Sequence, residues 1–202
     1  MPTIVRASSD AHLHEAYRFW YDIYVTEMER HVDDPLTDHA ARKLIDPIAP
    51  HGNLLLARED DGRVVGTLLS TWATEPCLAK YVALYRLDRL SSRQRAHATV
   101  TTKLMVAPEY RASRLGMLLA RKSYAWGLES QVHFDFIDCN DHLLRFFDKL
   151  GYRPHLGRIH HASYGEVNSL YLAVNDVVHL HNQRSPFYTL LARHQEAHRV
   201  YA

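Results

Sequence analysis

The sequence of 202 residues predicts an α/β fold, a mixed β-sheet flanked by helices. Short apolar runs with strand character alternate with segments in which apolar residues recur at helical spacing. A strong hairpin signal, Asp60-Asp61-Gly62, separates two apolar runs in the first third. The resulting order is strand, helix, hairpin, strand, helix, strand, helix, hairpin, which is typical of a sheet with helices on both faces.

The first half of the chain begins with a predicted strand at Thr3–Ala7. Asp10 can cap a helix that runs to about Val25. Residues 27–50 are acidic and contain prolines, and we expect a short helix around Thr37–Leu44 between loops. Two strands joined by the hairpin turn follow, at Asn53–Arg58 and Val64–Thr71.

The second half alternates more regularly. We expect a helix at Cys77–Leu90 and then a long strand at His97–Val106. The elements expected after these are a helix at Gly116–Glu129, a strand at Val132–Cys139, a helix at Asp141–Leu150, strands at Arg153–His160 and Val167–Val174 around a turn at Tyr164-Gly165, and a helical tail at Phe187–Ala202.

Length and composition predict one globular domain, residues 1–175, with residues 176–202 as a C-terminal extension packed on it. Hydrophobic residues make up 47% and charged residues 23%, as in ordinary soluble proteins. The formal net charge of +1 gives no reason to expect a nucleic-acid partner. Positive charge is local instead, in two clusters: Arg86, Arg89, Arg93 and Arg95, and Arg111, Arg114, Arg121 and Lys122.

Other features restrict the class of protein further. Cys77 and Cys139 have no metal-ligand spacing and favour a reducing, cytoplasmic setting. Residues 1–30 lack the pattern of a signal peptide, and no apolar run is long enough to span a membrane. The fifteen histidines are scattered, and the His160–His161 doublet has no carboxylate or cysteine near it in sequence, so no metal site is predicted.

The segment from Lys103 to Gly116 carries the first chemical signal. Its apolar run ends at Pro108, and a loop rich in Arg and Ser leads into the next helix. A helix start with unpaired backbone N–H groups, flanked by Arg111 and Arg114, suits a phosphate group. Ser113 can cap the helix, and Gly116 permits a close approach of phosphate to the backbone. The alternative is an ordinary strand-to-helix junction with two solvated arginines.

A second signal lies in Phe134–Tyr152. Its first part has the pattern of a buried strand, followed by Asn140 or Asp141 as a helix cap. Its second part is an amphipathic helix that ends at Gly151, with an apolar stripe formed by Leu143, Phe146, Phe147 and Leu150.

Together the two segments resemble the GNAT superfamily of N-acyltransferases. The first resembles that family's loop pattern Arg/Gln-x-x-Gly-x-Gly/Ala, and Phe146–Tyr152 is close to its phrase Phe-Tyr-Glu-Lys-Leu-Gly-Phe. The resemblance covers roughly residues 1–175 and implies a GNAT-like fold in which two parallel strands splay apart to hold a pantetheine arm. The donor-contacting positions that it implies are Leu104, Met105, Val106, Arg111, Ala112, Ser113, Arg114, Leu115, Gly116, Asn140 and Phe147.

Two residues depart from the family pattern. Arg114 stands where the family usually has its first glycine, which narrows the loop and adds a charge. Phe147 stands where many members have a tyrosine that protonates the leaving thiolate, and phenylalanine has no proton to donate. Positioning of the amine against the thioester would then carry most of the catalysis.

The attacking amine must be neutral, so a base or a water chain is required. By analogy with the family, Glu27 is the predicted base, whereas Glu29 reads as a solvated helix end. His133 and Asp138 are secondary candidates, and for Asp138 a cap or surface acid is the favoured interpretation.

Shorter matches point to a branch of the superfamily. Tyr21–Met28 and Asp176–Leu180 look like the N-acyl amino acid synthases and, more distantly, the acyl-homoserine lactone synthases. Lactone synthases typically carry Glu and Arg in the fourth strand where this chain has Val100 and Lys103, which argues against a lactone product. The branch implies a fatty acyl donor, acyl carrier protein or acyl-CoA, as a co-substrate with no permanently bound cofactor.

The sequence therefore predicts an N-acyltransferase that moves a fatty acyl group from a phosphopantetheine thioester to an amine of an amino acid or peptide. Tyr24, Trp72 and Phe134 are the expected substrate-lining residues, and the basic clusters suit an acidic carrier protein as partner. Two alternatives stay open: an acetyl-CoA-dependent N-acetyltransferase of a small molecule, and a non-catalytic module that binds acyl thioesters.

Overall fold

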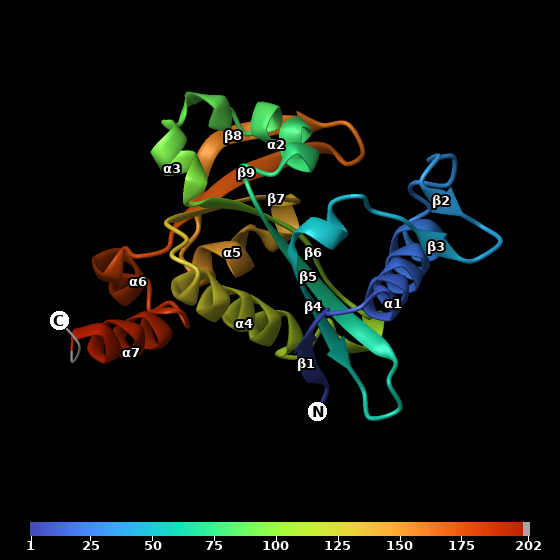
Figure 1. The fold of residues 1–202 in the computed structure, drawn as a ribbon, viewed down its shortest axis with the longest axis horizontal. Coiled ribbons are helices and arrows are strands. Elements are labelled where there is room, and N and C mark those ends of the chain that lie inside the picture. Colours follow the sequence, from blue (N-terminus) through green and yellow to red (C-terminus); the bar gives the residue numbers. More distant parts are fainter. Residues whose placement is uncertain (200–202) are drawn as a thin grey trace. The chain divides into compact units, whose positions relative to one another are not determined.

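The computed structural model describes residues 1–199 of the chain. Seven strands form a mixed sheet in the order β1-β4-β5-β6-β7-β9-β8, with helices packed against it (Figure 1). The chain divides into two compact units. Unit 1 contains residues 1–71 and 102–120, and unit 2 contains residues 72–101 and the described residues from 121 onward.

Unit 1 is built on antiparallel strands. β1 (Thr3–Arg6) pairs with β4 (Asn53–Arg58), which forms a hairpin with β5 (Val64–Trp72). Residues 53–57 of β4 are all buried, because this central strand is covered on both faces. The second half of β6 (Ala98–Val106) completes the unit's part of the sheet.

Helix α1 (Asp10–Trp20) begins where Ser9 accepts a hydrogen bond from the His12 amide, and it buries Tyr17, Phe19 and Trp20. The helix continues as a π-helical segment, η1 (Tyr21–Glu27). The predicted helical stretch is therefore present, but its last two turns are wider than an α-helix. Segments of π-helix are rare and often occur at functional sites.

The helix expected around Thr37–Leu44 is wrong. This segment forms a small two-stranded sheet of β2 (Thr37–Asp38) and β3 (Lys43–Leu44). The Asp38 carboxylate accepts from the Ala41 amide at 2.8 Å, and Arg42 has a left-handed φ of 50°. Side-chain bonds to nearby backbone offer the chain an alternative to the helix, which is why a turn forms here.

Unit 2 contains the first half of β6 with β7 (Phe134–Cys139), β9 (Gly165–Ala173) and β8 (Arg153–His161). β6 and β7 are parallel and pair through Ala98–Val100 and Phe134–Phe136. β9 pairs antiparallel with the whole length of β7 and with β8.

The helices of this unit lie between and after its strands. α4 (Leu115–Glu129) begins in unit 1 and continues into unit 2, and α5 (Leu144–Leu150) follows β7. α5 ends at Gly151, where φ is 105° and a Cβ would lie 2.5 Å from Leu180 Cδ2. α6 (Val177–Asn182) and α7 (Tyr188–Arg199) lie side by side (Figure 1). The helical tail is thus confirmed through Arg199, and its predicted last residues, 200–202, lie outside the described residues.

The segment Cys77–Leu90 is largely helical, as expected, but it is broken into short helices. It contains the short helices η3 (Pro76–Leu78), α2 (Ala79–Leu84) and η4 (Leu87–Arg89), and α3 (Ser92–Ala96) follows. Arg86 adopts a left-handed φ of 54°, which a continuous helix cannot contain. The break lets both Tyr85 and Leu87 become buried.

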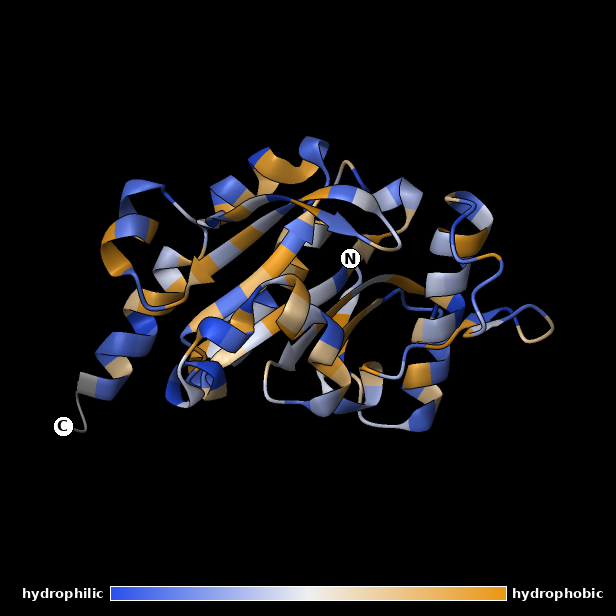
Figure 2. Ribbon diagram, turned by 90° about the horizontal axis from the view of Figure 1, so that it is seen from above, coloured by the Kyte–Doolittle hydropathy of each residue, from blue (hydrophilic) through white to orange (hydrophobic). Residues whose placement is uncertain are grey.

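The helices carry hydrophobic and hydrophilic bands side by side, as expected for helices with one buried face (Figure 2). In the described part of the chain, no helix is both long enough and apolar enough to cross a lipid bilayer. Within residues 1–199, no group of three or more His, Cys, Asp or Glu side chains is arranged to hold a metal ion.

Candidate functional site

The loop between β6 and α4 has the form that the sequence predicts for an anion site. Ser113 Oγ accepts a hydrogen bond from the Leu115 amide at 3.1 Å and donates to the Tyr110 carbonyl at 2.6 Å, so Ser113 caps the helix as predicted. Among residues 1–199, the following amides donate to no protein acceptor: Ala112, Arg114, Gly116 and Met117. These N–H groups at the N-terminus of a 15-residue helix form a concentrated region of positive potential.

The β4–β5 hairpin fixes the position of this loop. Tyr110 donates a short hydrogen bond to Glu59, and Arg63 contacts both Glu59, at 2.5 Å, and Glu109, at 2.7 Å. The hydrogen bond from Tyr110, followed by that from Arg63, lowers the pKa of Glu59. Charge-assisted contacts therefore tie the loop to the β4–β5 hairpin of unit 1.

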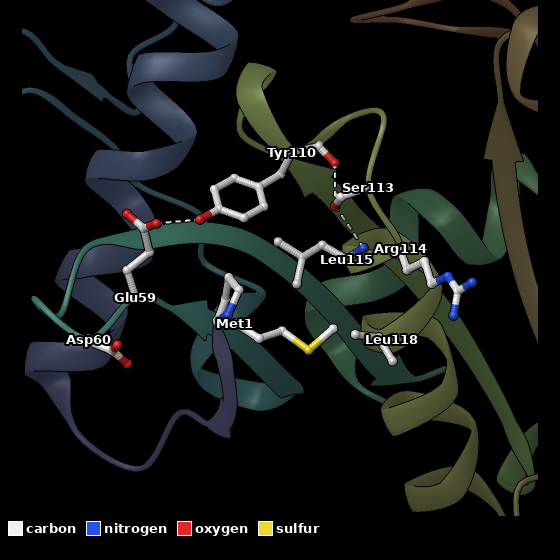
Figure 3. Close-up of a pocket in the computed structure, with 9 residues that line it drawn as sticks. Met1, Glu59, Asp60, Tyr110, Ser113, Arg114, Leu115 and Leu118 are labelled. Atoms are coloured by element: carbon white, nitrogen blue, oxygen red, sulfur yellow. Dashed lines mark hydrogen bonds between the residues drawn. The ribbon is translucent and has the colours of Figure 1, made fainter.

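A cavity of about 280 Å³ lies beside the loop (Figure 3). Its lining residues come from the N-terminal strand, the hairpin turn, the loop and α4: Met1, Pro2, Glu59, Asp60, Tyr110, Ser113, Arg114, Leu115 and Leu118. Arg114, the residue that replaces the family's glycine, is exposed and lies at the edge of this cavity. Its guanidinium is therefore accessible to a ligand.

Arg111 and Glu27, both predicted site residues, contact each other. Arg111 Nη1 lies 2.6 Å from Glu27 Oε1, and Nη2 lies 2.7 Å from Oε2, a bidentate ion pair. Glu27 is the last residue of the π-helical segment η1, which brings its carboxylate to the loop. Arg111 thus contacts both carboxylate oxygens of Glu27, and each oxygen keeps a second lone pair that can accept from another group.

The backbone of β6 changes character at Lys103. Residues 98–101 are buried, whereas Thr102–Val106 are half-buried, and Lys103 has a left-handed φ of 56° inside the strand. Thr67 Oγ1 donates to the Lys103 carbonyl at 2.9 Å, and Trp20 Nε1 donates to the same hydroxyl at 2.9 Å. This arrangement holds a strained residue in place just before Leu104, Met105 and Val106.

The Lys103 side chain lies in an aromatic and acidic pocket. Its ammonium is 3.3 Å from Asp46, 4.7 Å from the ring centre of Tyr24 and 5.2 Å from that of Trp20. The side chains of Lys103 and Asp46 are only 9% and 13% exposed. Tyr24, predicted as a substrate residue, thus contacts a cation that sequence reasoning did not assign to the site.

Four predicted site residues belong to unit 2. Phe147 is 3% exposed and packs edge-on against Phe146 and Tyr152, so it is a core residue. Trp72 and Phe134 are half-buried, and the Trp72 ring lies 5.9 Å from that of Trp126. Asn140 is half-buried at the end of β7, where its carbonyl accepts from the Leu143 amide.

Two acids on β7 form networks that sequence reasoning missed. Asp135 accepts from Thr99, Thr101 and Tyr152 at 2.6 to 2.9 Å, and burial raises its pKa to about 6. Asp138 accepts from the Tyr85 phenol at 2.7 Å. The interpretation of Asp138 as a cap or surface acid is wrong, because the carboxylate is half-buried and bonded to a buried tyrosine.

The chain was compared with known proteins. A solved structure of the acyl-homoserine lactone synthase BjaI with SAM and isopentyl-CoA superposes with a TM-score of 0.69 at 16% identity, covering 96% of this chain and 99% of that one. The lactone synthase LasI gives a TM-score of 0.66 at 13% identity, with 87% and 90% covered. ElaA of Escherichia coli gives 0.59 at 14% identity, with 85% and 99% covered. At these identities the similarity establishes the fold alone. No curated protein sequence matches this chain.

A comparison with protein-family models relates the sequence of this chain to a known family. The model described as the acetyltransferase (GNAT) family matches residues 14–152, more than half of the chain. The match includes both segments on which the resemblance was based, and the mixed seven-stranded sheet agrees with it. The chain belongs to the GNAT acyltransferase family.

Proposed function

We propose that this protein is an N-acyltransferase that moves a fatty acyl group from a phosphopantetheine thioester to an amine of an amino acid or peptide. The observation that carries the proposal is the loop before α4, where four unpaired amides lie in the same short segment as Arg111 and Arg114. Phosphate is the ligand that best matches such an array. A donor attached to coenzyme A or to a carrier protein would supply that phosphate.

The donor would occupy the positions named from the sequence. Its phosphates would bind the amides and side chains of Arg111–Gly116, and its pantetheine arm would lie along the half-buried residues Leu104–Val106. A backbone N–H near these residues would stabilise the oxyanion of the tetrahedral intermediate. The family resemblance also assigns Asn140 and Phe147 to the donor, and Phe147 would act through packing since its ring is buried.

Glu27 is the proposed base that prepares a neutral amine. Its bidentate contact with Arg111 suggests how it is released, because a bound phosphate competes for the same guanidinium. Donor binding would then free the Glu27 carboxylate for the amine, which couples proton removal to the presence of the donor.

The acceptor would lie near Tyr24, with Trp72 and Phe134 as further substrate residues. An acceptor carboxylate would have to displace Asp46 to reach the Lys103 ammonium beside Tyr24, because Lys103 and Asp46 are paired and only 9% and 13% exposed. The BjaI structure, which contains SAM and isopentyl-CoA, supports an amino-acid-like acceptor and an acyl thioester donor. Among the described residues, Cys77 and Cys139 form no disulfide, which is in keeping with a cytoplasmic enzyme.

The test is a matrix of donors and acceptors with the purified protein. Acetyl-CoA, decanoyl-CoA and decanoyl acyl carrier protein are each mixed with the twenty amino acids and short peptides, and products are identified by mass spectrometry. We expect N-decanoyl products with thiol release. Turnover with acetyl-CoA alone would favour the small-molecule N-acetyltransferase, a reading supported by the family's description. Donor binding without any turnover would favour the non-catalytic module.

A further inference from the structure

Residues 80–95 of unit 2 carry a concentration of positive charge that the proposed function has not yet used. The segment contains five basic residues and one acidic residue: Lys80, Arg86, Arg89, Arg93 and Arg95, and Asp88. Its formal charge is therefore +4, and since the whole chain carries +1, the remaining residues sum to −3. The segment is thus a local basic region on a chain that is otherwise slightly acidic.

The local fold keeps these arginines at the surface. The left-handed Arg86 turns the chain from α2 into η4, where Leu87 is fully buried and anchors the turn. The Arg86 side chain is about half exposed, and Arg89 is exposed at the end of η4. Ser91 begins α3 with a capping box, and Arg93 is exposed in that helix. The arginines therefore lie on consecutive short helices that a buried leucine and a capping box hold in place.

The guanidinium groups of this segment have little pairing within the protein. In the described part of the chain, Arg89, Arg93 and Arg95 form no ion pair. The Arg86 guanidinium is 3.9 Å from the exposed carboxylate of Asp88, a long and solvated contact. The charge of the segment is therefore available to a partner.

The second basic cluster of the sequence is engaged differently. Arg111 is paired with Glu27, and Arg121 donates to the Pro186 carbonyl. Arg114 lies at the edge of the cavity beside the loop before α4. That cluster therefore serves the loop and the packing of the chain, and residues 80–95 form the more accessible basic surface.

The chemistry of the segment favours an acidic protein as its partner. The planar guanidinium group binds carboxylates through two parallel hydrogen bonds. Residues 80–95, all of which the structure describes, expose no large hydrophobic side chain, so the segment offers no apolar anchor to a lipid surface. A formal net charge of only +1 provides no extended positive field for nucleic acid.

We propose that residues 80–95 are the docking surface for the acidic face of an acyl carrier protein. This inference rests on the proposed function, which includes a carrier-bound donor. The arginines would pair with aspartate and glutamate side chains of the carrier, which speeds encounter and fixes orientation. The protein part of the carrier then contributes to binding through a surface that coenzyme A does not use.

The experiment measures docking without the thioester. Calorimetry titrates the full chain with the apo form of a bacterial acyl carrier protein, which lacks the pantetheine arm, and separately with coenzyme A. At low salt, the double variant Arg89→Glu and Arg93→Glu should raise the Kd of the apo carrier about tenfold or more, because attraction becomes repulsion. Its Kd for coenzyme A should stay within about twofold of wild type.

The control is a double variant with the same change of charge elsewhere. Arg18→Glu and Arg193→Glu alter exposed arginines on α1 and α7. Carrier affinity in this control should stay within about twofold of wild type. An equal loss of affinity in both double variants would overturn the assignment, because net charge alone would then explain the effect.

Other outcomes also decide the question. Unchanged carrier affinity in the Arg89 and Arg93 double variant would overturn the assignment. Tighter binding of a short DNA duplex, or of vesicles containing phosphatidylglycerol, than of the carrier would do the same. If the glutamate variant does not fold, as judged by circular dichroism, Arg89→Ala with Arg93→Ala decides, with an expected rise in the carrier Kd of about threefold.

The docking test can fail separately from the proposed function. A wild-type chain that binds the apo carrier through these arginines but transfers no acyl group from any donor contradicts the function and supports the docking surface. A wild-type chain that transfers the decanoyl group from decanoyl-CoA but does not bind the apo carrier contradicts the docking surface and supports the function.

Discussion

At the scale of single residues, the loop between β6 and α4 is characterised by which of its groups already have partners within the protein. Arg63 is held by Glu59 and Glu109 and thereby anchors the loop, whereas Arg111 forms its ion pair with Glu27. The Arg111–Glu27 pair is about half exposed, so it contributes little stability and can exchange partners readily. The same guanidinium can therefore serve a carboxylate in the free protein and a phosphate in the complex.

Substitutions at Arg111 and at Glu27 should change the affinity for the donor in opposite directions. Arg111→Ala and Arg114→Ala should each raise the donor KM about tenfold or more with a smaller change in kcat, because each removes a charge-assisted contact worth roughly 1.5–3 kcal/mol. Glu27→Gln should instead lower the donor Kd, since Arg111 is then free for phosphate, while kcat falls. Calorimetry and steady-state kinetics measure both, with Arg158→Ala as the control. Unchanged donor affinity in all three variants would show that the arginines are merely solvated.

Asp135 makes a second residue-scale prediction, on stability. Its folded-state pKa of about 6 lies above the ordinary value, so the protonated form is favoured by folding. The stability from this group is fully present below about pH 4 and is lost as pH rises through about 6, a change of about 3 kcal/mol. Urea unfolding between pH 3.5 and 7.5 measures the free energy of unfolding, and in Asp135→Asn this decrease in stability with rising pH should be absent. Asp33→Asn, an exposed site with the same charge change, should keep it.

At the scale of elements, Lys103 lies where the buried first half of β6 gives way to its half-buried second half. The first half, from Ala98 to Thr101, pairs with β7 and belongs to the core. The second half begins at the left-handed Lys103. The hydroxyl of Thr67 and the indole of Trp20 hold that turn of the backbone, and Asp46 balances the charge. These contacts tie Lys103 to β5 and to α1 within unit 1.

The Lys103–Asp46 pair predicts a non-additive effect on stability. Lys103→Met leaves the Asp46 carboxylate without its charge partner in a nearly buried place, and should cost about 3 kcal/mol. Adding Asp46→Asn should recover much of that loss, because no charge is then left alone. A double-mutant cycle from urea unfolding measures the difference. Simple additivity of the two single substitutions would contradict this account.

At the scale of the whole molecule, the charge is nearly balanced, and the basic residues are gathered locally in sequence. A balanced protein does not bind polyanions in general, but local positive clusters can orient an acidic partner. Such clusters would suit the acidic carrier protein that the proposed function includes as a donor.

The donor should therefore show both chain-length and salt dependence. Each sheltered methylene contributes up to about 0.8 kcal/mol, so affinity should rise steeply with acyl length. A carrier-bound chain of about ten carbons should outperform acetyl-CoA, and its kcat/KM should fall between low and physiological salt. Kinetics over an acyl series at two ionic strengths test this. A better rate with acetyl-CoA and no salt effect would favour the small-molecule acetyltransferase.

The sequence by itself determined what depends on local pattern. The alternation of strand and helix signals gave the order of the main elements, and Pro108, Ser113 and Gly116 marked the capped loop before α4, because caps and turns are made by residues close in the chain. Only the tertiary structure decided which distant groups meet. Glu27 and Arg111 are 84 residues apart, and Tyr85 and Asp138 are 53 apart, so no periodicity could pair them. The left-handed backbone conformations of Arg42, Arg86 and Lys103 could not be predicted from the sequence either. The surrounding structure imposes these conformations, and the side chains of the three residues do not favour them.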